Sequence, residues 1–288
     1  MTQDMPPRQP SEDSDTASQH AEKLAVLDGQ PEPVVAFSHL YDHNDHVADH
    51  AHDRAQLLHP SCGVVAVTTD AGRWLVPPGH ALWIPAGTRH AVDAIGRAET
   101  HSIYVRQDAG AMMSGHFPGQ PPAQLPQHLH VAGMTPLMRS LMLEAVRLRG
   151  EPHAPRSAFI LGAMLHEITQ LPERPLGLPF PTHPKLARIC RSFVASPSAH
   201  LEIKQWADAI GMSRRSFTRL FRRETGLSLS TWRQQACLLS ALPRLSAGEP
   251  VTTIALELGY DSVPAFTTMF RRMLGTPPKT YLRNRPED

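Results

Sequence analysis

One short pattern occurs twice in the last hundred residues of this 288-residue chain, and the capping serines of its two copies are 49 positions apart. Each copy has an amphipathic stretch, then a glycine turn at Gly211 or Gly259, then a serine, Ser213 or Ser262, that can cap a second helix. Aromatic residues follow each serine by four and eight positions, which places them on one helix face. Two short helices joined by a turn containing glycine make a helix-turn-helix unit. The repeat therefore predicts two such units.

The polar face of the second helix in the first copy is crowded with basic and hydroxyl side chains. Arginine can grip phosphates and read guanine edges bidentately. For a single helix of this kind, a solvated face of a helix bundle is the simpler interpretation, and the duplication, the spacing of the two copies and the charge distribution together favour DNA. The candidate DNA-contacting residues of this helix are Arg214, Arg215, Thr218, Arg219, Arg222 and Arg223.

The formal net charge of +1 conceals two opposed halves. Residues 183–288 contain 16 basic and 8 acidic residues, whereas residues 1–182 contain 12 basic and 19 acidic ones. Such an asymmetry indicates that the C-terminal half has a nucleic-acid partner. Between the two copies, about Leu229 to Ala247 predicts a connecting helix about 28 Å long. Successive major-groove faces of B-DNA are about 34 Å apart, so one chain could reach both. Pro243 predicts a kink or an early end of this helix.

Four regions follow one another along the chain. Residues 1–33 lack aromatic residues and are rich in polar residues and proline, which predicts a disordered tail. Residues 34–171 begin with short β-prone runs between turn-forming residues, which indicates a small sandwich or barrel, and end with two helices starting near Thr135 and Arg156. We expect residues 108–133, between these parts, to be irregular. Closely spaced prolines predict a linker at residues 172–182, and residues 183–288 are expected to be helical throughout.

Residues from about 183 to 285 resemble the DNA-binding domain of the AraC/XylS family. The most specific stretch is V-x2-I-A-x3-G-Y-x-S from Val251, followed by Phe266, Phe270-Arg271, Gly275, Pro278 and Tyr281. The resemblance implies a seven-helix domain whose two helix-turn-helix units dock in neighbouring major-groove segments of double-stranded promoter DNA. By position, it implies base-facing residues at Arg215, Thr218 and Arg219 in the first unit and at Val263, Pro264, Ala265 and Thr268 in the second.

The second set departs from the polar pattern of the family. Valine, proline and alanine cannot make bidentate base contacts, although they can touch a thymine methyl group. We therefore expect the first unit to carry most of the sequence readout and the second to position the protein on phosphates. The DNA contacts expected from the second unit are Ser262, Thr268, Arg271 and Arg272.

The N-terminal half is rich in histidine, with nine histidines from His39 to His101. The order is His50-x-His52-x3-Gln56, and downstream Gly79-x5-Pro85-x-Gly87-x2-His90. Two histidines at alternate strand positions point to the same face, and His90 can approach them from a neighbouring strand. Three imidazoles and one oxygen donor suit a first-row divalent metal such as Zn, Ni, Fe or Mn.

These spacings resemble the two cupin motifs, and the region resembles the cupin-like sensor domain of some AraC-type regulators. In metal-binding cupins the position of Gln56 is usually Glu and that of Ala94 is usually Asn. Because a neutral amide is a poorer ligand than a carboxylate, two interpretations stay open. Either His50, His52, Gln56 and His90 hold a metal, or they line an effector pocket and form hydrogen bonds inside the barrel without one.

The predicted fold is multidomain α and β: an N-terminal cupin-like β-barrel with two helices, then an all-α domain with two helix-turn-helix units. The leading function is a sequence-specific transcriptional regulator, not an enzyme, that senses a small-molecule effector or a metal. The alternative is a metal-dependent cupin enzyme, an oxygenase or isomerase, with an accessory helical domain. It is disfavoured because no carboxylate–base pair or nucleophile accompanies the histidines.

Several expectations about partners and location follow. The helices at 135–171 carry apolar stripes that suit either a homodimer seam or a cover for the barrel. An activator would also contact RNA polymerase, but no motif fixes the sign of regulation, the effector or the operator. The three distant cysteines form no CxxC, no apolar run approaches the ~18 residues of a membrane span, and the N-terminus lacks signal-peptide features. We therefore expect a cytoplasmic protein without a membrane partner.

Overall fold

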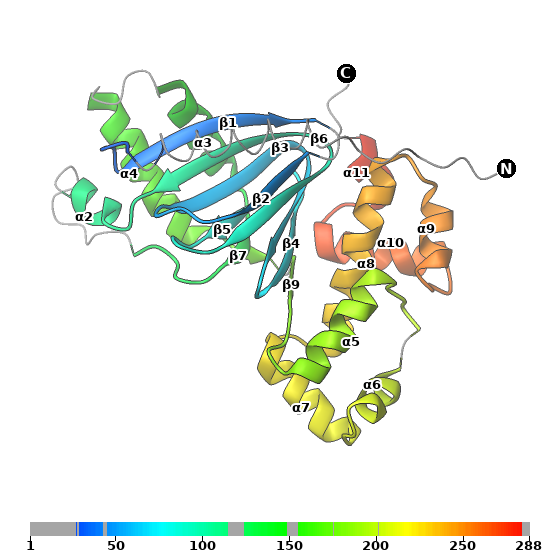
Figure 1. Ribbon diagram of the computed structural model, residues 1–288. Helices are drawn as coiled ribbons and strands as arrows, with labels where there is room; N and C mark the ends of the chain where they lie inside the picture. The colour runs from blue at the N-terminus through cyan, green and yellow to red at the C-terminus, as the bar shows by residue number, and fades with distance from the viewer. Residues whose placement is uncertain are drawn as a thin grey trace, which may run out of the picture.

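The computed structural model describes residue 27 and the ranges 29–42, 45–114, 124–148, 155–174, 176–200 and 202–283. Most of the predicted disordered tail, residues 1–26 and residue 28, lies outside these ranges. A sheet-rich N-terminal part and a helical C-terminal part lie side by side (Figure 1). Leu27 is buried against Val35 and Tyr104, so the packed structure begins before the first strand. Within the described ranges, no helix is both long and apolar enough to cross a membrane.

The N-terminal part is built on antiparallel strands that join into one sheet. β6 is its centre, because it pairs with β1, β2 and β3; β5, β7 and β8 continue the sheet beyond β3, and β4 joins β3 to β9. The strands are β1 (Val34–Tyr41), β2 (His46–His50), β3 (Ala55–Thr69), β4 (Gly72–Val76), β5 (His80–Ile84), β6 (His90–Val105), β7 (His130–Gly133), β8 (Glu173–Arg174) and β9 (Gly177–Pro179).

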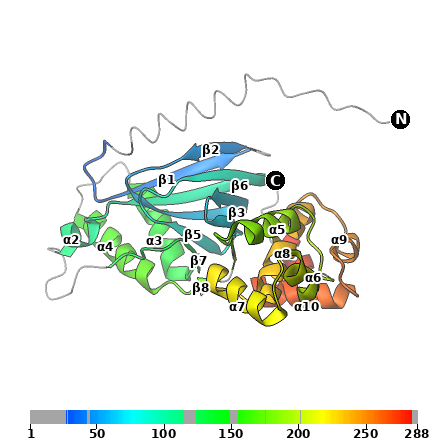
Figure 2. The ribbon, with the colours of Figure 1, turned by 60° about the horizontal axis from the view of Figure 1, so that its bottom comes forward.

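Helices cover one face of this sheet (Figures 1 and 2). α3 (Pro136–Arg147) begins at Thr135, whose side chain accepts a hydrogen bond from the backbone N–H of Met138 at 3.0 Å. α4 (Pro155–Gln170) packs beside α3, and together they bury Leu57, Trp83 and Ile103 of the sheet. The region expected to be irregular contains the short helix α2 (Ala109–Ser114) and β7 among its described residues.

The Pro-rich segment expected to be a linker is part of the sheet. β8 pairs with β7, and β9 pairs with β4. The edges of β7 and β4 offer unpaired backbone groups, and a neighbouring extended segment satisfies them by adding a strand. The same segment also contacts the helical part. The Nε1–H of Trp232 donates a hydrogen bond to the carbonyl of Pro179 at 2.8 Å. The segment thus ties the sheet to the helices instead of acting as a free spacer.

All described residues from 183 to 283 are helical or in turns and loops, as the sequence predicted. An aromatic cluster of Trp206, Phe217, Phe221 and Trp232 forms the core around the first copy of the repeat. Pro243 does not end its helix early, because it lies in the last turn, where little helix follows it. The helices are α5 (Pro184–Ala195), α6 (Ile203–Ala209), α7 (Arg214–Thr225), α8 (Leu229–Ser246), α9 (Val251–Glu257), α10 (Val263–Leu274) and α11 (Pro278–Arg283).

The β3–β6 ladder changes register between Pro60 and Val64, and Gly63 lies at this point with φ of +72°. A Cβ atom on Gly63 would lie 2.3 Å from the carbonyl oxygen of Arg97 and 2.6 Å from Cα of Ala98. Gly79 also has a positive φ, +80°, but a Cβ there would meet nothing within 4 Å. These two glycines therefore separate the cost of the backbone conformation from the cost of close packing.

We expect Gly79→Ala to lower the free energy of unfolding by about 1–2 kcal/mol, the cost of a left-handed backbone for a residue with a Cβ. Gly63→Ala should lower it by clearly more, because two backbones must also move apart. Denaturant unfolding of both variants measures the difference. Equal losses would show that the close approach at Gly63 has no energetic weight.

Candidate functional site

The two copies of the repeat fold alike at both ends of their second helix. The Oγ of Ser213 accepts a hydrogen bond from the N–H of Ser216 at 3.2 Å, and the Oγ of Ser262 accepts one from Ala265 at 3.3 Å. α7 and α10 then both end at a left-handed glycine, Gly226 or Gly275. Each glycine again lies 49 residues from its counterpart. In both views α7 and α10 lie apart, with α8 between them (Figures 1 and 2).

The residues predicted to contact DNA are on the exposed faces of these helices. The opposite faces are buried in the core, on Phe217, Leu220 and Phe221 in α7 and on Phe266, Met269 and Phe270 in α10. A rigid apolar face therefore fixes the direction of the polar one. The exposed candidates are Arg214, Arg215, Thr218, Arg219, Arg222 and Arg223 at α7, and Ser262, Thr268, Arg271 and Arg272 at α10.

The two exposed faces differ in charge at equivalent positions. Applying the 49-residue offset, Arg215 of α7 corresponds to Pro264 of α10, and Arg219 corresponds to Thr268. The hydroxyl of Thr268 donates to the carbonyl of Pro264 at 2.9 Å, as that of Thr218 in α7 donates to the carbonyl of Arg214. Arg272 is also engaged within the chain, since it hydrogen-bonds to Gln234 of α8. α10 thus presents fewer charged side chains to solvent than α7.

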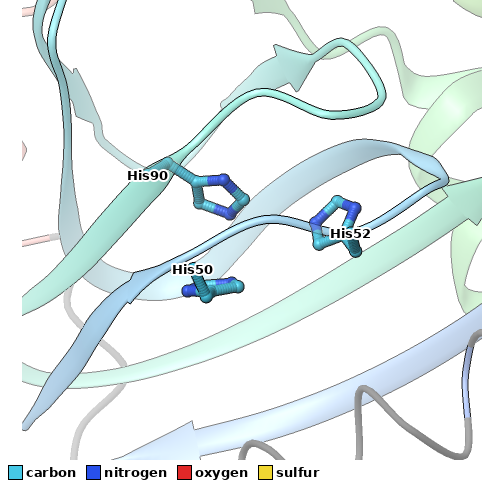
Figure 3. A group of neighbouring side chains, drawn as sticks. All are labelled: His50, His52 and His90. Carbon is cyan, nitrogen blue, oxygen red and sulfur yellow. The ribbon is translucent and has the colours of Figure 1, made fainter.

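The histidines predicted to form a site come together at one end of the sheet (Figure 3). His50 is the last residue of β2 and His90 the first residue of β6, and the two are register partners. Their ring centroids are 4.3 Å apart, and the ring of His52 lies 6.0 Å from His50 and 5.2 Å from His90. One potential ligand atom from each ring lies within 4.8 Å of the others.

Backbone carbonyls fix the orientation of all three rings. The Nδ1 of His50 lies 2.8 Å from the carbonyl oxygen of Ala48, that of His52 lies 2.5 Å from Arg54, and that of His90 lies 2.8 Å from Thr88. A carbonyl only accepts, so Nδ1 carries the proton and Nε2 is the nitrogen that would bind a metal. The Nε2 atom of His90 is buried and has no hydrogen-bond partner among the residues that the structure describes.

Gln56 completes this group from the start of β3. Its Oε1 lies 3.2 Å from the Nε2 of His52, and its Nε2 donates to the hydroxyls of Ser102 at 3.0 Å and Tyr104 at 3.1 Å. With the proton of His52 on Nδ1, two acceptors face each other, and a cation between them relieves the repulsion. An inverted amide would instead donate to His52, which suits a site without metal. The donor set therefore fits a metal and also fits hydrogen bonding to an effector.

Burial disfavours the charged forms of His50 and His90. Desolvation lowers the pKa of His90 to about 4, and it also lowers the pKa of the half-buried His50. A neutral imidazole is the form that binds metal ions. Burial also raises the pKa of the Tyr104 hydroxyl above its usual value, so this group stays a hydrogen-bond donor at neutral pH.

The sequence did not reveal the contributions of Ser102 and Tyr104. They alternate along β6, and Tyr104 is the register partner of Gln56 on β3. The sequence shows that Ser102 and Tyr104 are two positions apart, but it does not show that Tyr104 bonds to Gln56, which is 48 positions away.

Comparisons with known proteins agree with this architecture. Residues 32–175 match the AraC-like ligand binding domain, and residues 206–284 match a helix-turn-helix domain. The HTH-type transcriptional regulator NimR of Escherichia coli K12 is 33% identical over 234 residues, which cover 81% of this chain and 81% of NimR. The chain belongs to the AraC family of transcriptional regulators.

Two further proteins match this chain over different shares of its length. The regulatory protein SoxS of Escherichia coli K12 is 34% identical over 82 residues, which are 28% of this chain and 77% of SoxS. The crystal structure of ToxT from Vibrio cholerae O395, bound to (E)-4-(8-methylnaphthalen-1-yl)but-3-enoic acid, aligns with a TM-score of 0.38 and 10% identity. That alignment covers 88% of this chain and 99% of ToxT.

Family membership decides between the functions that the sequence left open. The N-terminal sheet-rich domain is a ligand-binding domain, and the C-terminal helical domain binds DNA. The protein is therefore a transcriptional regulator that acts on promoter DNA, and not a cupin enzyme with an accessory domain.

Proposed function

We propose that this AraC-family regulator reads its promoter mainly with α7, uses α10 mainly to position itself on phosphates, and changes its DNA affinity when a small-molecule effector or a metal ion binds at the histidine site. One observation carries the link between sensing and reading. Glu224, on the DNA-facing helix α7, accepts hydrogen bonds from the end of the segment that leaves the sheet.

The distribution of arginines supports unequal roles for the two helices. Arg215 and Arg219 are exposed on α7, whereas Pro264 and Thr268 stand at the equivalent positions of α10. Bidentate guanidinium contacts specify a base, while single phosphate contacts only position the protein. α8, between the two units, is 18 residues long, or about 27 Å. This length supports docking of α7 and α10 in neighbouring major-groove segments about 34 Å apart.

Arg219→Ala should relax the preference for one base pair of the operator at a cost of about 1–3 kcal/mol, because it removes a base-reading guanidinium. Thr268→Ala should leave base preference almost unchanged. Selection of binding sites from random DNA by the full-length protein measures both. Arg222→Ala is the matched control, expected to weaken all sequences uniformly and to lower the salt slope of log K by about 1. The reverse pattern, with Thr268 controlling preference, would contradict the assignment, and absence of any specific complex would contradict promoter binding.

We further propose that the N-terminal sheet is a cupin-like barrel whose histidine site holds a divalent metal such as Zn, Ni, Fe or Mn. The buried Nε2 of His90, which has no hydrogen-bond partner in the described part of the chain, supports this, as do the facing acceptors of His52 and Gln56. His50, His52 and His90 would supply imidazole ligands, and Gln56 would supply an oxygen. A bound ion would offer a Lewis-acid centre to an oxygen or nitrogen atom of an effector.

His90→Ala should lower the metal content of the purified protein by one equivalent, because it removes a ligand whose ring is already oriented by Thr88. His50→Ala should do the same. Metal analysis of protein grown with Zn, Ni, Fe or Mn measures the content. His46→Ala, which changes an exposed histidine of β2 paired with Asp93, is the control and should retain the metal. Unchanged metal content in His50→Ala or His90→Ala would contradict this ligand set.

The path from the sensor to DNA runs through the segment 172–182. β9 is paired with β4 of the sheet, and the carbonyl of Pro179 accepts from Trp232 of α8. Thr182 lies three residues beyond Pro179. The Oε2 of Glu224 accepts hydrogen bonds from the N–H of Thr182 at 3.1 Å, from the Thr182 hydroxyl at 2.6 Å and from the N–H of His183 at 3.2 Å. The Thr182 hydroxyl contributes most to lowering the pKa of the Glu224 carboxyl. Movement of the sheet edge thus reaches α7 through fixed hydrogen bonds.

Glu224→Ala should reduce the ratio between the DNA affinities of zinc-loaded and metal-free protein towards one, because Thr182 and His183 would no longer be bonded to α7. Fluorescence anisotropy with operator DNA measures both affinities. Glu202→Ala changes an exposed carboxylate at the start of α6 and should keep the wild-type ratio. The same ratio in Glu224→Ala as in wild type would contradict this path, and a ratio of one in wild type would contradict metal sensing.

Self-association and contact with RNA polymerase remain proposals. α3 and α4 cover the sheet, yet Leu137, Leu143 and Phe159 are 57%, 42% and 61% exposed on them. Exposed apolar side chains on adjacent helices support a homodimer seam on this side of the protein. The expected cytoplasmic location likewise stays a prediction.

A further inference from the structure

A second group of metal-ligand side chains lies at the outer edge of the sheet, apart from the histidine site. His128 precedes β7, His130 is the first residue of β7, and Glu173 is in β8. One potential ligand atom from each of these residues lies within 4.8 Å of the others. His128 and Glu173 are well exposed and His130 is half-buried, so an ion could reach them from solution.

Strand pairing brings these three side chains to one face. His128 and His130 are two positions apart in extended chain, and their ring centroids are 4.9 Å apart. Glu173 is the register partner of Ala132, which is two positions beyond His130 on β7. Residues opposite each other in an antiparallel pair share a face, so Glu173 belongs to the face of both histidines.

Hydrogen bonds orient the donor atoms. The Nδ1 of His130 lies 3.0 Å from the carbonyl oxygen of His128, which places its proton on Nδ1 and the lone pair on Nε2. The Nε2 of His128 lies 2.8 Å from Oε1 of Glu173. Two ligands of one tetrahedral ion lie only slightly farther apart, at about 3.3 Å for metal–ligand distances of 2.0–2.1 Å. An ion could replace the shared proton with little movement.

We propose that His128, His130 and Glu173 form a second divalent transition-metal site, with two imidazoles, one carboxylate and water as ligands. Zinc suits such a set, which keeps at least one coordination position open. Its ligands come from both sides of the β7–β8 pairing, so the ion fastens β8 to the sheet. β8 lies at the start of the segment that continues through β9 to α5 and that contacts α8 at Trp232 and α7 at Glu224. This proposal does not depend on metal binding at His50, His52 and His90.

The simpler interpretation of this cluster is a surface ion pair between His128 and Glu173, with no metal bound. Exposed pairs of this kind are weak and need only two residues. The two readings differ in what they require of His130. An ion pair survives His130→Ala, whereas a metal site loses a ligand. His130→Ala is therefore the decisive variant.

The test is calorimetric titration of the metal-free full-length protein with Zn²⁺, in a His50→Ala, His90→Ala background that removes the first site. We expect one equivalent to bind, with affinity at least tenfold lower in His130→Ala and in Glu173→Gln. His166→Ala, an exposed histidine of α4 outside both groups, should bind as the parent does. Absence of binding in the parent, unchanged affinity in His130→Ala, or an equal loss in His166→Ala would overturn the site.

A second measurement uses the wild-type chain and does not require the background variant to fold. Hydrogen exchange at the backbone amides of β7 and β8 should slow when Zn²⁺ is added to wild type and should not change in His130→Ala. Exchange that slows equally in both proteins would overturn the role of His130. In metal analysis, His130→Ala should contain one equivalent of Zn²⁺ less than wild type, because both proteins keep His50, His52 and His90 unchanged.

Discussion

The antiparallel pairing of β6 with its neighbours is the constraint on which the sensor domain depends. β6 pairs with β1, β2 and β3, and its first residue, His90, is the register partner of His50. The same strand later carries Tyr104 opposite Gln56. A shift of one residue would turn every one of these side chains to the other face. The register change near Gly63 divides the long β3–β6 ladder into two parts. One part pairs Gln56 with Tyr104, and the other continues towards the His90 end of β6.

The second constraint is the connection between sheet and helices. Strand addition at β4 and β7 converts a proline-rich segment into a tether with fixed ends. The carbonyl of Pro179 then meets Trp232, which is completely buried in the aromatic core of the DNA-binding domain. An effector can shift DNA affinity only if two states differ in contacts between the domains. These contacts are among them, and buried apolar residues of the sheet and of α8 also share one core cluster. The proposed zinc site would hold the N-terminal end of this proline-rich segment, at Glu173 of β8.

Much of the DNA-binding domain could be predicted because its information is local. Serine caps and aromatic residues at four and eight positions lie within one helix, and each was predicted from the sequence. The structure added the pairing of Arg272 with Gln234, which lies 38 residues away on α8. In the sensor domain, the three histidines were identified by their spacing, but the carbonyls that orient them and the partners of Gln56 were not. Those contacts depend on the strand register, which no local pattern specifies.

The sequence by itself determined the order of the domains, the duplicated helices, the opposite charges of the two halves and the histidines that could share a ligand. Only the tertiary structure decided that the proline-rich segment belongs to the sheet, that Glu224 holds its end, and that Glu173 meets His128 across 45 positions. The physical reason is the same in each case. Helix periodicity and capping act within a few residues, whereas strand edges accept any extended partner, and packing of the whole chain selects which one.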